Sequence, residues 1–144
     1  MFGSFLPSAW SSTKAYSGRG SRRSYAIRNG PRAVEFYQAA FGAEVLFRMD
    51  SDGAVVARLA VEGAEFWVAD ESPEHQNFSP ETLGGGTVRM VMIVADPDRA
   101  IERAVGAGAK VVVAVRNEYG WRLGRGVEPY GHHWEIGRPD ELGS

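Results

Sequence analysis

The sequence contains no cysteine among its 144 residues, which excludes disulfide bonds, thiolate metal sites and a cysteine nucleophile. Histidine is scarce as well: there are only three, and two of them, His132 and His133, are adjacent. Neighbouring residues of a strand face opposite sides, so only one of this pair can join a given site. A chain without cysteine suits a reducing compartment, and we expect a cytoplasmic protein.

Long hydrophobic runs are also missing, because no apolar stretch approaches the roughly 18 residues of a membrane-spanning helix. We therefore expect no membrane partner. Acidic residues are absent from residues 1–34, which hold six basic groups, whereas the remaining 110 residues hold 10 basic and 18 acidic groups. The folded body is thus acidic, and this argues against nucleic acid as a partner.

The length and the 44% hydrophobic content indicate one globular domain, which we place at residues 22–138. The residues before it are rich in serine and glycine without apolar periodicity, so we expect a disordered tail. Each half of the domain reads as β-α-β-β-β, and a polar, flexible linker joins the halves. The expected divisions are a tail, a first module, a linker, a second module and a short end: residues 1–21, 22–70, 71–86, 87–138 and 139–144.

The two halves repeat each other in sequence as well as in pattern. Residues 32–35 (R-A-V-E) match residues 99–102 (R-A-I-E) at an offset of 67, within the two predicted helices. An internal repeat of this size indicates duplicated supersecondary units. We therefore predict an α+β fold of two modules, with a helix on one face of each four-stranded sheet and the other faces forming a concave pocket.

The C-terminal stretch carries the candidate site. A polar, Gly-rich turn region at 117–122 precedes a strand, and the turn at 128–131 (E-P-Y-G) leads into a last strand, His132 to Ile136. Alternation along that strand sends Trp134 and Ile136 into a core and sends His133 and Glu135 to the opposite face. Glu135 is therefore a candidate site residue, although a solvated carboxylate on an open sheet face explains it equally well.

Three segments of the sequence resemble the vicinal oxygen chelate superfamily, which includes glyoxalase I, bleomycin-resistance proteins and extradiol dioxygenases. They are R-A-V-E-F-Y-Q-A-A-F-G-A (32–43), A-D-P-D-R-A-I-E-R-A-V-G-A-G-A (95–109) and Y-G-W-R-L-G-R-G-V-E-P-Y-G-H-H-W-E-I (119–136). The last segment looks most like the PhnB-like branch. The resemblance covers about residues 22–138 and implies the duplicated module, but it does not specify one reaction.

Metal-using members of this superfamily place ligands on the first, fourth, fifth and eighth strands. Counting from the matched motifs puts these positions at Arg22, near Trp67, at Arg89 and at Glu135. Arginine and tryptophan side chains offer no lone pair to a cation, whereas a transition metal needs three or more converging His or carboxylate groups. The resemblance therefore implies a site with no cofactor, in which Glu135 and His133 become metal ligands only under the alternative of a metal-dependent enzyme.

A pocket with arginine in place of a metal favours a small anionic or aromatic ligand. Arg89, and Arg22 beside it, would pair with Glu135 and grip an anion, while Trp67 or Trp121 would stack on a ring. His133 completes the expected ligand-binding set. Two alternatives remain open: catalysis, with Glu135 as a general base or in a divalent-metal lyase, isomerase or dioxygenase, and an inert or regulatory scaffold. We also expect a homodimer, because each module has open edges.

Overall fold

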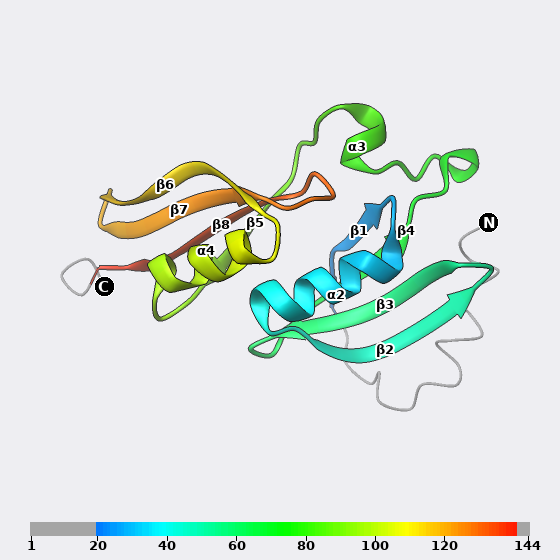
Figure 1. Ribbon diagram of the computed structural model, residues 1–144, viewed down its shortest axis with the longest axis horizontal. Helices are drawn as coiled ribbons and strands as arrows, with labels where there is room; N and C mark the ends of the chain where they lie inside the picture. The colour runs from blue at the N-terminus through cyan, green and yellow to red at the C-terminus, as the bar shows by residue number, and fades with distance from the viewer. Residues whose placement is uncertain (1–19, 141–144) are drawn as a thin grey trace.

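The computed structural model describes residues 20–140, which form two β-α-β-β-β modules arranged side by side along the long axis (Figure 1). Each module is a four-stranded sheet with one parallel pair, in the orders β1-β4-β3-β2 and β5-β8-β7-β6. The predicted α+β class and the internal repeat are thereby confirmed. The first module comprises β1 (Ser24–Ile27), α2 (Gly30–Phe41), β2 (Glu44–Ser51), β3 (Ala54–Val61) and β4 (Ala64–Asp70). The second comprises β5 (Arg89–Ile93), α4 (Pro97–Gly106), β6 (Lys110–Glu118), β7 (Trp121–Val127) and β8 (His133–Pro139).

The helices begin where short polar side chains cap them. The Asn29 side chain accepts a hydrogen bond from the N–H of Arg32 at the start of α2, and Asp96 accepts one from Arg99 at the start of α4. These caps satisfy N–H groups that the helix itself leaves unpaired. Gly42 ends α2 in the left-handed conformation, with φ of 66°. The two modules therefore repeat the N-terminal capping of the helix as well as its apolar face.

The hairpin of β6 and β7 is longer than the sequence indicated. Residues 117–122 read as a turn region, yet Asn117 pairs with Arg122 and Glu118 with Trp121 in the antiparallel ladder. Only Tyr119 and Gly120 form the turn, and both have positive φ, 52° and 77°. Two consecutive positive φ values are typical of the tight turn that matches the twist of paired strands. Trp121 consequently lies in a strand rather than in a loop.

The linker is also more ordered than expected, and its reading as a flexible connector is corrected. It contains a 3₁₀ turn, η2 (Pro73–His75), and a short helix, α3 (Pro80–Leu83). The Glu71 carboxylate accepts hydrogen bonds from the Ser79 N–H at 2.9 Å and from the Thr82 hydroxyl at 2.8 Å. These contacts lower the pKa of Glu71 and fix the path of the chain over the junction of the modules. The expected tail, 1–21, lies outside the described residues except for Gly20 and Ser21.

One aromatic core joins the modules. Trp134 of β8 is 3% exposed and packs against Phe41 (ring centroids 4.6 Å apart) and Phe66 (5.6 Å) of the first module. Helices α2 and α4 lie side by side at the junction of the modules (Figure 1), and the Arg103 Nε donates to the Ala39 carbonyl at 2.8 Å. Because β8 contributes to the core of both halves, the last strand is held by the first module as well as the second.

Gly30 is required by a close approach at the start of α2. Its N–H donates to the Asp70 carboxylate at 3.0 Å, and the same carboxylate accepts from the Val55 N–H at 2.7 Å. A Cβ at position 30 would lie 2.2 Å from an Asp70 oxygen.

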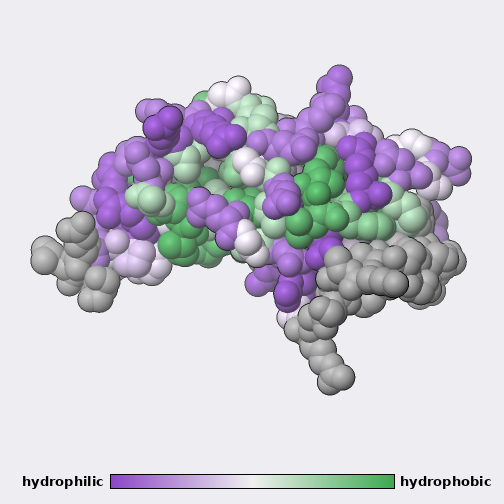
Figure 2. Space-filling view, turned by 90° about the horizontal axis from the view of Figure 1, so that it is seen from below, coloured by the Kyte–Doolittle hydropathy of each residue, from purple (hydrophilic) through white to green (hydrophobic). Residues whose placement is uncertain are grey.

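Apolar residues gather over both modules on the face seen in Figure 2. Within residues 20–140, no helix is long and apolar enough to cross a membrane.

Candidate functional site

The face of the second sheet that is turned away from α4 carries the candidate site, and we call it the open face. Trp134 and Ile136 of β8 are buried on the helix side, with exposures of 3% and 1%, as their alternation predicted. His133 and Glu135 point the other way and are half-buried. In the strand register His133 lies beside Arg89 of β5, and Glu135 lies between Val91 of β5 and Arg125 of β7.

Four polar side chains line a cavity of about 490 Å³ on this face, together with residues 86–88 and Val91: Arg89, Arg125, His133 and Glu135. The Arg89 Nε lies 3.4 Å from the Glu135 carboxylate, so the expected ion pair is present. Arg125 is directly opposite Glu135, but it makes no side-chain hydrogen bond or ion pair within residues 20–140, and its buried Nε has no partner. The cavity therefore presents one paired and one unpaired guanidinium.

The imidazole of His133 is uncharged at neutral pH. Burial lowers its pKa, and the positive charges of Arg125 and Arg89 lower it further. Its Nδ1 is buried and has no hydrogen-bond partner among the described residues. His133 thus contributes a neutral ring, with one unused ring nitrogen, to a cavity whose fixed charges are two arginines and one glutamate.

Apolar side chains continue the open face beyond Glu135. Val91, Ile93, Trp121 and Leu123 line a second hollow of about 290 Å³, with Glu135 at its edge. Val91 and Ile93 are 61% and 52% exposed, which is unusual for branched aliphatic residues on strands. The open face therefore combines an electropositive end with an apolar end, and this is the composition of a small-molecule site.

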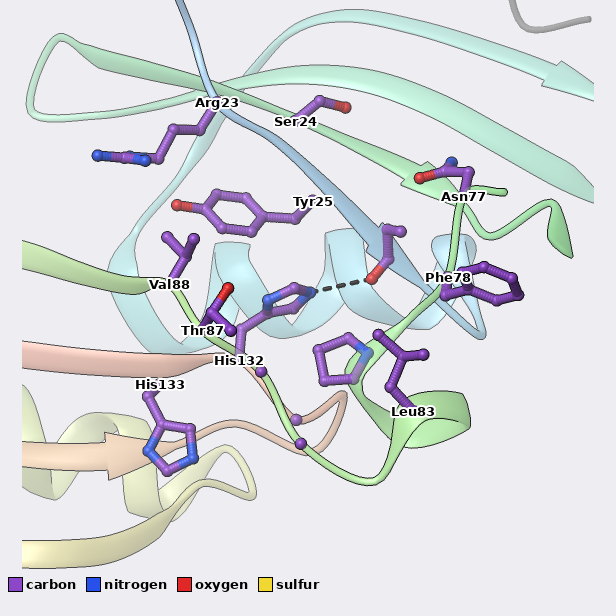
Figure 3. Close-up of a pocket in the computed structure, with 15 residues that line it drawn as sticks. Arg23, Ser24, Tyr25, Asn77, Phe78, Leu83, Thr87, Val88, His132 and His133 are labelled. Atoms are coloured by element: carbon purple, nitrogen blue, oxygen red, sulfur yellow. Dashed lines mark hydrogen bonds between the residues drawn. The ribbon is translucent and has the colours of Figure 1, made fainter. Parts of the chain in front are cut away.

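A third cavity, of about 650 Å³, lies between β1, the linker and the start of β8, and we call it the linker pocket. Figure 3 shows Tyr25, Phe78, Leu83 and His132 around it. The His132 Nε2 lies 3.0 Å from the Ala26 carbonyl, so this histidine ties the start of β8 to β1 and has a structural role. The linker pocket shares residues 86–88 and His133 with the charged cavity, so the two are adjacent.

The structure brings together Arg89, His133 and Glu135, with Trp121 on the same face, but it places the other two expected residues elsewhere. Arg22 precedes β1, is exposed, and donates to the Ser21 carbonyl at 3.1 Å. Trp67 lies on β4 of the first module and packs near Phe47. Neither residue lines the open-face cavities. In the ladder Ser24 pairs with Trp67, and β1 begins two residues after Arg22.

Sequence analysis missed Arg125, although a signal for it was present. Leu123, Arg125 and Val127 are spaced two residues apart in β7, so their side chains lie on the same face of the sheet. The turn at 128–131 then fixes the antiparallel register that sets Arg125 opposite Glu135. The alternation of β7 and the alternation of β8, taken together, place Arg125 and Glu135 on the same face.

Sequence analysis also missed a buried carboxylate at the junction of the modules. Glu128 is 3% exposed, accepts hydrogen bonds from the His132 N–H at 3.1 Å and the Trp134 Nε1 at 3.4 Å, and receives the Tyr37 hydroxyl. Burial raises the pKa of Glu128 to about 7, against its hydrogen bonds, which act to lower it. Glu128 lines none of the three larger cavities, so its role is in holding the modules together.

The residues of the open face do not fit the divalent metal that many proteins of this fold hold. Within residues 20–140, no three His, Asp or Glu side chains converge on one point. Among the described residues that line the open face, the groups able to bind a metal are His133, Glu135 and Glu118, and the two carboxylates are engaged by Arg89 and Arg116. A transition metal needs three or more such donors, and two nearby guanidiniums oppose a cation. We therefore derive no chemistry through a metal.

Comparison with known proteins supports the fold. An uncharacterised protein of Mycobacterium tuberculosis (strain H37Rv) is 36% identical over 119 residues, covering 78% of this chain and 70% of that protein. The crystal structure of an Arabidopsis thaliana gene product is similar with a TM-score of 0.69 and 26% identity, over 83% of this chain and 98% of that one.

A third comparison shows the fold alone. TnmS3, an antibiotic binding protein of a Streptomyces species, is 17% identical with a TM-score of 0.60, over 87% of this chain and all of that one. The family described as the glyoxalase/bleomycin resistance protein/dioxygenase superfamily matches residues 24–136, which include both modules and the whole open face. The chain belongs to the glyoxalase/bleomycin resistance protein/dioxygenase superfamily.

Proposed function

We propose that this protein binds a small anionic or aromatic molecule on the open face of its second module, without a metal ion. The observation that carries the proposal is the guanidinium of Arg125, which shares a cavity with the Arg89–Glu135 pair and borders an exposed apolar hollow. Arginine grips anions by two parallel hydrogen bonds, and Trp121 and Leu123 offer a surface to a ring.

Three further features belong to this proposal. The run V-E-P-Y-G-H-H-W (127–134) favours the PhnB-like branch of the superfamily. The open edges of the two sheets favour a homodimer. The absence of cysteine is compatible with a cytoplasmic location. The relation to TnmS3, an antibiotic binding protein, makes antibiotics one class of ligand to screen.

The rival function is a divalent-metal lyase, isomerase or dioxygenase that uses Glu135, with His133 as a second ligand. It requires further donors that the open face lacks among the described residues. It also requires Glu135 to leave Arg89, with which it forms an ion pair. The donor set therefore favours binding over metal-dependent catalysis.

The experiment is a fluorescence titration of the protein in EDTA with 2-naphthoate and a panel of aromatic acids and antibiotics. We expect saturable binding that weakens about tenfold when Trp121→Ala removes the stacking surface, since such contacts contribute roughly 1 kcal/mol or more. Leu83→Ala, in the linker pocket, is the matched control and leaves binding unchanged. The proposal is wrong if no compound of the panel binds, or if only the Leu83 variant weakens binding.

A further inference from the structure

We propose that Arg125 is the anion receptor of the open face and that it selects ligands with a single carboxylate attached to an aromatic body. This inference rests on the proposed function and narrows its ligand class. It differs from the expectation drawn from the sequence, in which Arg89 held the anion. In the structure the Glu135 carboxylate already occupies Arg89, at 3.4 Å.

The unused hydrogen-bonding capacity of Arg125 supports this role. Arg125 lies directly opposite Glu135 in the β7–β8 ladder, yet the carboxylate turns to Arg89. The Nε of Arg125 is buried and has no partner within residues 20–140. Arg125 lines the charged cavity without a protein acceptor within residues 20–140, so the planar donors of its guanidinium are available to a ligand. A ligand carboxylate supplies two oxygens that match the planar donors of arginine.

The charge balance of the cavity favours a monoanion. Its lining residues include two guanidiniums and one carboxylate, and the pKa of His133 is lowered by burial first and then by the two arginines. One positive charge is therefore unbalanced, and one carboxylate neutralises it. A phosphate monoester with two negative charges would leave an excess negative charge close to Glu135, which is unfavourable in a partly desolvated cavity.

The strand geometry sets the size of the ligand. Leu123 and Trp121 lie on the same face as Arg125, two and four residues away along β7. At about 3.3 Å per residue, their Cα atoms are roughly 7 Å and roughly 13 Å from that of Arg125. A carboxylate on Arg125 thus places a two-ring aromatic system over Leu123 and towards Trp121. The apolar hollow lined by Val91 and Ile93 faces the same rings.

The test compares three probes that share a naphthalene ring and differ in charge: 2-naphthoate, 2-naphthamide and 2-naphthyl phosphate. Dissociation constants are measured in EDTA for the wild type, Arg125→Gln, Arg125→Lys and Arg48→Gln. Arg48 is the matched control, because it is a half-exposed arginine of β2 paired with Asp50, away from the open face. Denaturant unfolding of each variant checks that the fold is retained.

We expect the wild type to bind 2-naphthoate at least about tenfold more tightly than the amide or the phosphate. Arg125→Gln abolishes that preference, Arg125→Lys restores part of it, and Arg48→Gln leaves it unchanged. A preference for the acid that survives Arg125→Gln overturns the role of Arg125 and leaves the proposed function standing. Equal binding of acid and amide by the wild type overturns the selection of an anion. Failure of all three probes to bind the wild type removes the inference, and failure of the wider panel as well removes the proposed function.

Discussion

Protonation of Glu128 is expected to control the stability of the protein near neutral pH. The carboxylate is buried at the junction of the modules, where the Tyr37 hydroxyl, the His132 N–H and the Trp134 indole contact it and no ion pair with a described cation is formed. Burial raises the pKa of Glu128 from 4.5 to about 7 in the folded protein. The folded state therefore holds this proton more tightly than the unfolded state does.

The sign and size of the effect follow from that difference. A carboxyl whose folded pKa is raised contributes stability that is fully present below pH 4.5 and is lost as the pH rises through about 7. Between about pH 5.5 and about pH 8.5 the loss amounts to about 2 kcal/mol, since one pKa unit corresponds to about 1.4 kcal/mol. His132 and His133 act in the opposite direction, because burial lowers their pKa values and the folded state resists their protonation.

Glu128→Gln separates this contribution from the histidines. We expect the free energy of unfolding of the variant, from urea titrations, to gain about 2 kcal/mol relative to the wild type as the pH rises over that interval. The control is Glu62→Gln, which neutralises an exposed carboxylate in the turn between β3 and β4 and leaves the pH profile unchanged. A difference between the wild type and Glu128→Gln that stays constant from pH 5.5 to pH 8.5 would refute the reasoning.

Three further predictions concern the fold and the assembly. Gly30→Ala should lower the free energy of unfolding by about 1–3 kcal/mol, because its Cβ would lie 2.2 Å from the Asp70 carboxylate. Gly106→Ala is the control and should not destabilise the protein, because no atom lies within 4 Å of its Cβ. Equal urea midpoints for the two variants would contradict this prediction. Light scattering at micromolar concentration should give about twice the 15.7 kDa of one chain, and a monomer would contradict the homodimer. Deletion of residues 1–20 should shift the melting temperature by no more than a few degrees, since those residues lack apolar periodicity, and a larger loss would show that they dock on the domain.

The sequence predicts the duplicated fold well because each module encodes it locally. The capping residues Asn29 and Asp96, the helix-ending Gly42 and the tight turns each act within a few residues of chain. The faces of β8 follow from alternation, so Trp134 and Glu135 were assigned correctly to core and open face. Signals of this kind need no knowledge of what packs against them.

Contacts between distant segments could not be predicted in the same way. A glutamate in a turn is ordinarily exposed, and only the docking of Tyr37 and Trp134 buries Glu128. The role of Arg125 depends on which arginine forms an ion pair with Glu135. Side-chain geometry determines this, and the sequence does not show it. The first strand is short and weakly patterned, and the structure places Arg22 before β1 and outside both open-face cavities.

The central claim is that the open face binds its ligand without a metal ion. The most direct measurement is calorimetric titration of 2-naphthoate into metal-stripped protein, repeated in the presence of Zn²⁺, Ni²⁺, Mn²⁺ or Fe²⁺, with each metal also titrated alone. We predict the same affinity for 2-naphthoate with and without metal, and no stoichiometric metal binding, because the described donors of the open face, His133, Glu135 and Glu118, do not converge on one point. One-to-one metal binding that Glu135→Gln abolishes, with ligand binding only in its presence, would contradict the account.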